Sequence, residues 1–212
     1  MARKTKEDAE QTYAALLEAA EQMFFDKGVA HTTLNDIAAA AGMTRGAIYW
    51  HFKDKADVLQ ALIAQAMLPM EAMLVELDIC ADANPLAALR QMCVRALTTL
   101  AGSPRQQRVF SIMFFKCENI GEVVTVMENK LARRDECFTQ IQGILVRAVG
   151  NGQLPADTDV FLAQQTINFF IAGTMREWLL SPDSFSLEKA APSMVDMVMA
   201  GLQTNPPRTP SN

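Results

Sequence analysis

Apolar side chains recur at intervals of three and four residues along almost the whole chain, with polar side chains between them. The first such stretch has its apolar positions at Tyr13, Leu16, Ala20, Met23 and Phe24 and its polar face at Glu18, Glu21 and Gln22. This spacing places apolar side chains on one face of a helix, and Gly28 marks the end of that helix. No segment has the pattern of a convincing β-strand, so the sequence predicts an all-α protein.

Residues that start and stop helices divide the next part of the chain into short elements. A capping-box pattern at residues 33–36 opens a short helix that Gly42 ends. Thr44 is suited to cap a second short helix, which runs to about Phe52. Two short helices joined by a glycine-containing turn predict a helix-turn-helix over about residues 33–52.

Longer helices follow this segment. They are predicted over about 54–78 with a kink at Pro69, and over about 85–100, 104–117, 121–149, 158–180 and 187–203. The tail from Asn205 to Asn212 contains three prolines and is expected to fray. The chain therefore divides into an N-terminal three-helix domain, residues 1–55, and a larger helical domain, residues 56–212.

The second short helix carries the chemistry that DNA recognition needs. A recognition helix places its N-terminal side chains on base edges in the major groove. Arg45 is able to contact guanine through two hydrogen bonds, which are worth about 1–3 kcal/mol of discrimination. Gly46 costs about 1 kcal/mol within a helix, and a close approach to a DNA backbone would explain that cost. Hydroxyl, aromatic and basic side chains nearby suit phosphate oxygens, and Thr33 starts a helix whose N-terminus favours anions. The candidate DNA-binding residues are Thr33, Thr44, Arg45, Gly46, Tyr49, Trp50, His51 and Lys55.

Some of these residues also have a purely structural interpretation. Tyr49 and Trp50 are equally compatible with a half-buried aromatic pair, and an isolated histidine such as His51 is more often a surface or capping residue. The basic N-terminal residues 3–6 form either a flexible tail that reaches DNA or simply a solvated end. Taken together, the caps, the turn and the spacing favour the DNA-binding interpretation.

The net charge of the chain and the positions of its basic residues limit the ways in which it can bind DNA. The 212 residues carry a formal net charge of −5, which argues against coating of nucleic acid or membranes by bulk charge. Residues 1–60 hold seven Lys/Arg and nine Asp/Glu, but the basic groups gather in the N-terminal tail and around the second short helix. Few phosphate contacts per subunit imply modest non-specific affinity and a dimer that gains specificity.

The residues from Thr33 to Lys55, TLNDIAAAAGMTRGAIYWHFKDK, resemble the DNA-binding signature of the TetR family. The first six residues, residues 115–118 (FKCE) and residues 178–185 (WLLSPDSF) are similar to the branch of that family that represses multidrug efflux pumps, the AcrR, TtgR and MtrR group. The resemblance implies an N-terminal helix-turn-helix domain and a C-terminal helical ligand-binding and dimerisation domain. It further implies a homodimeric repressor that leaves a pseudo-palindromic DNA operator when a hydrophobic small-molecule inducer binds.

The last two predicted helices fit the dimerisation role. The helix over 158–180 is apolar almost all round, with one line at Ile167, Ile171, Met175 and Trp178 and further apolar side chains on other faces. The helix over 187–203 adds Met194, Val195, Val198, Met199 and Leu202. Isologous pairing of both helices with a second copy would form a four-helix interface, whereas the alternative is one large monomeric core.

A ligand cavity between helices is implied for the larger domain, which holds ten of the thirteen methionines. Methionine is unbranched and polarizable, so it adapts to ligands of different shape. Asn168 is suited either to orient a ligand or to form a hydrogen bond within a dimer interface, and core packing is the competing interpretation for the apolar candidates. The candidate ligand-binding residues are Met67, Met70, Met73, Met92, Cys93, Met113, Phe114, Cys137, Ile141, Asn168 and Met175.

Other function classes find less support. Both histidines lie within the first 51 residues, and the sequence has no G-x-S-x-G or phosphate-cradling glycine loop, so we expect no catalytic residue, metal site or cofactor. The remaining alternatives are an activator or a regulator of lipid or metabolic genes, a helical enzyme, and a structural helical dimer. The four cysteines form no CxxC pair, no signal peptide is apparent, and no apolar run approaches the about 20 residues of a membrane helix. We therefore expect a cytoplasmic protein with no membrane contact.

Overall fold

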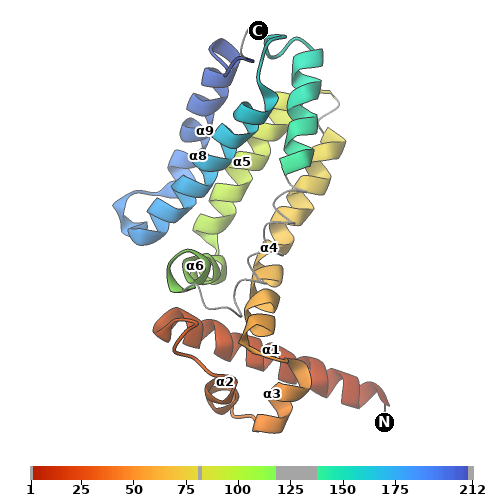
Figure 1. Cartoon of the computed structure of the whole chain (residues 1–212), viewed down its shortest axis with the longest axis vertical. Helices are drawn as coiled ribbons and strands as arrows, with labels where there is room; N and C mark the ends of the chain where they lie inside the picture. Colours follow the sequence, from red (N-terminus) through yellow and green to blue (C-terminus); the bar gives the residue numbers. More distant parts are fainter. Residues whose placement is uncertain (1, 81–82, 118–137, 210–212) are drawn as a thin grey trace. The chain divides into compact units, whose positions relative to one another are not determined.

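The computed structural model describes residues 2–80, 83–117 and 138–209 (Figure 1). These residues are almost entirely helical, and their only β-type pairing is an isolated bridge between Thr158 and Arg208. The predicted all-α class is therefore confirmed. Within the described ranges no helix is long and apolar enough to cross a membrane.

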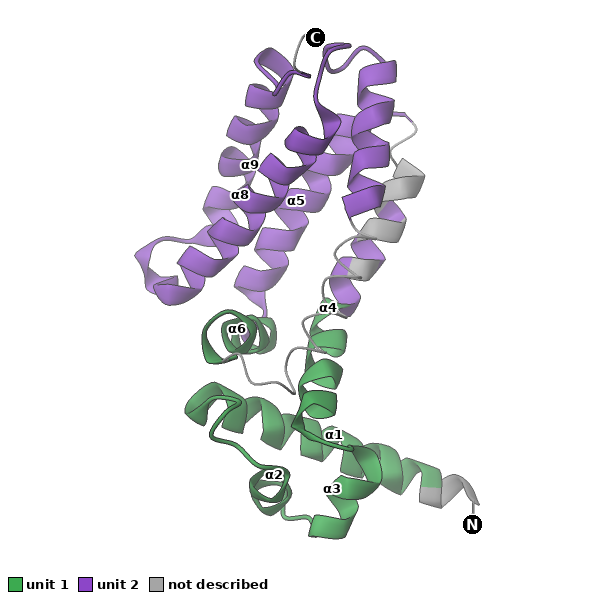
Figure 2. Cartoon of the chain, in the orientation of Figure 1, with its two compact units in different colours: residues 1–67, 105–131 green, residues 68–104, 132–212 purple. Residues whose placement is uncertain are grey.

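The chain forms two compact units, which are coloured separately in Figure 2. Unit 1 comprises residues 1–67 and 105–131, and unit 2 comprises residues 68–104 and 132–212. This division differs from the expected domain boundary at residue 55, because the start of the long fourth helix and residues 105–117 pack with the N-terminal helices. The division into a DNA-binding domain, 1–55, and a ligand-binding domain, 56–212, stays a prediction about function.

Unit 1 begins with three helices: α1 (Ala2–Lys27), α2 (Leu34–Ala40) and α3 (Arg45–His51). The helices α2 and α3 pack on each other and on α1 (Figure 1). The predicted capping box is present, since Thr33 accepts from the Asp36 N–H while the Asp36 carboxylate accepts from the Thr33 N–H. Two glycines provide the left-handed backbone that ends helices, with φ of +84° at Gly28 and +67° at Gly42. The predicted helix-turn-helix is therefore confirmed, with boundaries within a residue or two of the expected ones.

The basic N-terminal segment belongs to a helix rather than to a flexible tail. The helix α1 already begins at Ala2, which corrects the expectation of a flexible end. The core of unit 1 lies between α1, α2, α3 and the first half of α4 (Lys55–Cys80), the helix that contains Pro69. Its fully buried side chains include Leu16, Phe24, Ile37, Ile48 and Leu59.

The segment after Ser103 completes unit 1 in a way that the sequence did not predict. The helix α6 (Pro104–Ser111) gives way to a π-helical turn, η1 (Ile112–Lys116), where one continuous α-helix to residue 117 was expected. Ile112 is fully buried in the core of unit 1, and the Val29 N–H donates to the Lys116 carbonyl at 3.2 Å. This turn is therefore attached to the loop that follows α1.

Unit 2 contains α5 (Pro85–Gly102), α8 (Val160–Leu180), α9 (Leu187–Thr204) and helical residues 138–150. The helix α5 packs against α8 and α9 (Figure 1). On the surface, Arg90 of α5 forms an ion pair with Asp196 of α9, which lowers the pKa of the Asp196 carboxyl. The part of the predicted helix 121–149 that precedes residue 138 lies outside the described residues.

Residues 205–209, the described part of the C-terminal tail, are held in place, which corrects the expectation that this part frays. The Asp159 N–H donates to the Pro207 carbonyl at 2.8 Å, and the Thr209 N–H donates to the Asp157 carbonyl at 3.0 Å. An ion pair between Arg208 and Asp157 accompanies these bonds. Residues 205–209 therefore pair with the segment that precedes α8.

Candidate nucleic-acid interface

The helix α3 has one buried and one exposed face. Ile48 is fully buried in the core of unit 1, and Phe52, directly after the helix, is buried beside it. The remaining surface of the helix exposes Arg45, Gly46 and Tyr49. The Arg45 guanidinium lies 5.4 Å from the centre of the Tyr49 ring, a cation–π arrangement that holds the cation at the surface. The first turn of α3 thus presents the group that is able to contact a guanine edge.

Gly46 is not required by the packing of unit 1. A Cβ placed at this position would have Thr44 Oγ1 at 3.9 Å as its only neighbour within 4 Å. Its φ is not positive, so the backbone does not need glycine either. Since a glycine within a helix costs stability, the absence of an internal reason supports the hypothesis that a partner approaches α3 closely here.

The aromatic residues at the end of α3 are exposed rather than paired in the core. Tyr49 is 48% exposed and Trp50 is 71% exposed, so the alternative of a half-buried aromatic pair is wrong. His51 is half-buried, with its ring centroid 4.5 Å from that of Trp50 and 5.6 Å from that of Tyr13. Burial lowers the pKa of His51 from its ordinary 6.5, so its imidazole is neutral at pH 7 in the free protein.

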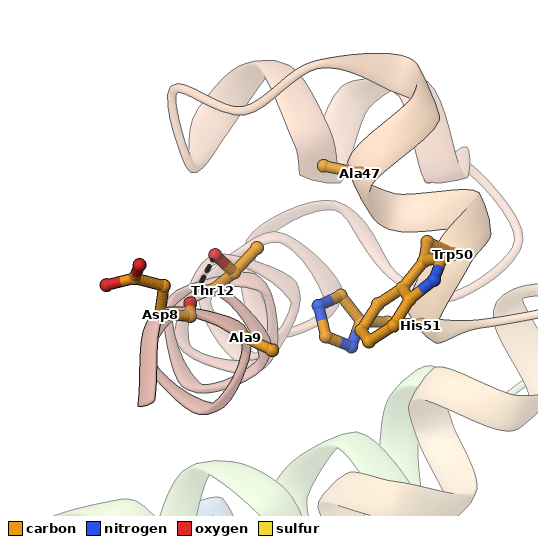
Figure 3. A pocket seen from close by; sticks show the side chains of 6 residues that line it. All are labelled: Asp8, Ala9, Thr12, Ala47, Trp50 and His51. Atoms are coloured by element: carbon orange, nitrogen blue, oxygen red, sulfur yellow. Dashed lines mark hydrogen bonds between the residues drawn. The ribbon is translucent and has the colours of Figure 1, made fainter. Parts of the chain in front are cut away.

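A shallow groove lies between α3 and the first turns of α1 (Figure 3). Trp50 and His51 form one wall, and Ala9 and Thr12 form the other. Asp8 lies at its rim, and the Thr12 hydroxyl donates to the Asp8 carbonyl at 2.8 Å. Because the Asp8 carboxylate repels anions, phosphate groups are favoured on the exposed side of Trp50 rather than inside this groove.

Two of the predicted DNA contacts are already engaged within unit 1. The Thr33 hydroxyl donates to Asp36 Oδ2 at 2.7 Å, and these bonds lower the pKa of the Asp36 carboxyl. Lys55 Nζ donates to the Val29 and Ala30 carbonyls, at 3.3 and 3.4 Å. A DNA-binding role for either side chain stays a prediction, and each must exchange or share these bonds to contact a phosphate.

A buried carboxylate that the sequence did not single out joins α1 to α6 within unit 1. The side chain of Glu21 is only 4% exposed, and its two oxygens accept from Arg105 Nε at 3.0 Å and from Arg108 Nε at 2.7 Å. Arg105 also donates to Gln65 of α4. Arg105, which belongs to α6, therefore connects this helix to α1 and α4. In the sequence, Glu21 belongs to the polar face of this helix, where that face borders the apolar one.

The candidate ligand-binding residues are distributed over both units. Met67, Met113 and Phe114 belong to unit 1, and Met70, Met73, Met92, Cys93, Ile141, Asn168 and Met175 belong to unit 2. Met73, Cys93, Met113, Ile141 and Met175 are buried, and the others are half-buried. Cys137 lies outside the described residues. A ligand-binding role stays a prediction for the whole set.

The exposed face of α8 carries four large apolar side chains, with the charged Arg176 among them. At 100° per residue, Phe161, Leu162, Phe169 and Leu180 share one face of α8, and all are more than 40% exposed. Met197 of α9 is 68% exposed. The line formed by Ile167, Met175 and Trp178 is buried within unit 2 instead. Exposed apolar side chains that gather on one helix face are typical of an interaction surface.

Comparison with known proteins identifies both parts of the chain. Residues 16–62 match the model of bacterial regulatory proteins of the tetR family, and residues 84–204 match the C-terminal region of MAATS-type transcriptional repressors. The HTH-type transcriptional regulator TtgR of Pseudomonas putida is 35% identical over 206 residues, which cover 97% of this chain and 98% of that protein.

Two solved structures are similar over nearly the whole chain. NalD, the secondary repressor of the MexAB-OprM multidrug efflux pump in Pseudomonas aeruginosa, matches with a TM-score of 0.85 and 31% identity, and covers 94% of this chain and 99% of its own. The complex of SmeT with triclosan matches with a TM-score of 0.80 and 28% identity, and covers 95% and 96%. SmeT is the repressor of the SmeDEF multidrug efflux pump of Stenotrophomonas maltophilia.

Proposed function

Because the chain belongs to the tetR family of bacterial transcriptional regulators, we propose that it represses a multidrug efflux pump operon and leaves its operator when a hydrophobic small molecule binds. The observation that carries this proposal is the likeness to NalD, a repressor of such a pump, over 94% of the chain. The likeness to SmeT bound to triclosan supports a small apolar inducer. The exposed first turn of α3, with Arg45, Gly46 and Tyr49, supports the DNA-binding part.

Operator recognition follows from the chemistry of α3. Arg45 contacts a guanine edge in the major groove, and Gly46 lets the helix approach the DNA closely. Thr44, Tyr49 and Trp50 face phosphate oxygens, and His51 reaches one only when its ring turns out of the groove that Asp8 lines. A homodimer formed through the exposed apolar faces of α8 and α9 presents two copies of α3 to half-sites about 34–36 Å apart.

Release requires that ligand and DNA oppose each other through a coupling free energy. The Glu21 cluster is suited to carry this coupling, because it attaches α6 and α4 to α1, on which α2 and α3 pack. A ligand that favours another arrangement of α6 would then disfavour the arrangement of the helix-turn-helix that fits the operator. The long helix α4 contributes to the same coupling.

A gel-shift or anisotropy titration on the DNA upstream of the protein's own gene tests this proposal. The wild type should bind that DNA and should be released by triclosan or by a hydrophobic cation or dye. Arg45→Ala should abolish the preference for the operator over unrelated DNA, whereas Lys55→Ala should weaken both about equally. Equal effects of the two variants, or operator affinity that no hydrophobic compound changes, would contradict the proposal.

The same titration separates the alternatives. A regulator of lipid or metabolic genes would be released by an acyl-type ligand and not by drugs or dyes. An activator would bind its operator more tightly, or remain bound, when its ligand is present. A structural helical dimer or an enzyme would show no preference for the upstream DNA.

A further inference from the structure

Gln164 of α8 is a buried amide without a partner. Its side chain has no solvent exposure, and neither Oε1 nor Nε2 forms a hydrogen bond in the part of the chain that the structure describes. A primary amide can donate two hydrogen bonds and accept two, and buried polar groups are nearly always bonded. An amide buried in this way therefore indicates a partner that is not part of the folded chain.

The surroundings of Gln164 are apolar. On α8 it shares a face with Ile167, Asn168, Ile171 and Met175, and Asn168 follows one turn later. The helix packs against α5, whose buried side chains are aliphatic or sulfur-containing. Two amides one turn apart thus lie on a helix face that is otherwise made for apolar contact.

In the described part of unit 2, no charged side chain is buried as a whole, although the Nε atom of the half-buried Arg147 is enclosed. Among the described residues of unit 2, the buried polar side chains are Thr158 and Gln164, and the Thr158 hydroxyl already donates to the Pro155 carbonyl at 2.7 Å. No buried carboxylate is available there to replace the hydration of a cation. The groups present suit a neutral molecule that offers both a donor and an acceptor.

We propose that Gln164 is the polar anchor of the ligand site in unit 2 and selects neutral, mainly apolar molecules that carry a hydrogen-bond donor and acceptor side by side on one edge, as in the cis amide of a lactam. The ligand amide accepts from Nε2 and donates to Oε1, which satisfies both orphaned atoms. This inference rests on the proposed function, since it assigns the specificity of the inducer site. It concerns a residue outside the set predicted from the sequence.

Equilibrium dialysis with a matched pair of probes tests the assignment. Phenanthridin-6(5H)-one and phenanthrene have nearly the same shape, but only phenanthridinone carries an amide donor and acceptor on one edge. The ratio of phenanthridinone to phenanthrene affinity should fall by roughly tenfold or more in Gln164→Leu, because the variant leaves the ligand amide unpaired. Gln165→Leu, which removes the same group at the next position of α8, should keep the wild-type ratio.

A second readout separates ligand recognition from a structural role. Gln164→Leu should melt at or above the temperature of the ligand-free wild type, because it replaces an unpaired buried amide with an apolar group. A lower melting temperature shows that the amide is bonded in the folded protein, by an internal water for instance, and overturns the inference. An unchanged affinity ratio, failure of the wild type to bind phenanthridinone, or tighter binding of tetraphenylphosphonium than of phenanthridinone also overturns it.

Failure of the proposed function is recognised independently. If phenanthridinone binding depends on Gln164 but no ligand changes the affinity for the upstream DNA, the site assignment stands and the proposed derepression fails. If ligands release the DNA but the affinity ratio is unaffected by Gln164→Leu, the proposed derepression stands and the assignment of Gln164 fails.

Discussion

Replacing Glu21 with glutamine perturbs the link between α1 and α6 with a minimal change of shape. Each bond from an arginine to the carboxylate is worth about 1.5–3 kcal/mol when a charged group is involved. Glu21 is almost fully buried, but Arg105 and Arg108 are 51% and 37% exposed and return to water when the charge is removed. Glutamine also keeps one acceptor oxygen. The expected loss of unfolding free energy is therefore about 2 kcal/mol, below the range for a broken buried pair.

Thermal unfolding measures this loss directly. For a chain of this size, about 2 kcal/mol corresponds to a decrease in melting temperature of roughly 4–8 °C. Glu18→Gln is the matched control, because Glu18 lies exposed on the same helix and its replacement removes the same charge. The control should melt within about 0.5 kcal/mol of the wild type.

The same variant tests whether the Glu21 cluster transmits the ligand signal. Operator affinity is measured by fluorescence anisotropy with and without saturating triclosan, at a temperature well below both melting transitions. Typical coupling changes affinity by about 5–150-fold. In Glu21→Gln, triclosan should change the operator affinity by no more than about threefold. In Glu18→Gln, triclosan should change it as much as in the wild type. A normal melting temperature would refute the energetic reasoning, and a lower one with unchanged coupling would show that the cluster is purely structural.

Three further expectations concern other parts of the molecule. Gly46→Ala should stabilise the protein by up to about 1 kcal/mol in thermal unfolding, because its Cβ makes only an ordinary contact with Thr44 Oγ1, and yet weaken operator binding in a gel shift. Loss of stability would show that the glycine serves the fold. Phe169→Glu, at a side chain that is 69% exposed on α8, should convert the dimer to a monomer in sedimentation experiments, and an unchanged mass would place the interface elsewhere. Since the pKa of Asp36 is lowered in the folded state from 3.8, its stabilisation is present above that pH and is lost as the pH falls through the folded value. Asp36→Asn should flatten this part of an acid titration followed by circular dichroism.

Local signals allowed the sequence to predict most of the fold. The Thr33–Asp36 capping box, the Thr44 cap and Gly42 act within a few residues, so their effect is readable without tertiary structure. The same is true of Arg45, which directly follows the Thr44 cap and is exposed in the first turn of α3.

Long-range contacts account for what the sequence did not predict. Glu21 is 84 and 87 residues away from its two arginine partners, and nothing in the local pattern links them. The prolines of the C-terminal tail suggested fraying, yet the Pro207 carbonyl accepts a bond from Asp159, far earlier in the chain. A proline lacks a donor but keeps a carbonyl, so it is able to serve in such a contact.

The attachment of the tail to the segment before α8 has a consequence for association. Asp159 caps α8 through its carboxylate, which accepts from the Leu162 N–H at 2.9 Å, while its own N–H is held by the tail that follows α9. These hydrogen bonds join the two ends of the segment from Asp157 to Thr209, so the segment forms a ring without a covalent link. A ring of this kind loses little conformational freedom when it docks, because its two helices are already fixed at both ends. A second copy that docks on α8 and α9, as proposed, would therefore meet a preorganised hairpin, and more of the apolar contact energy would remain available as binding affinity.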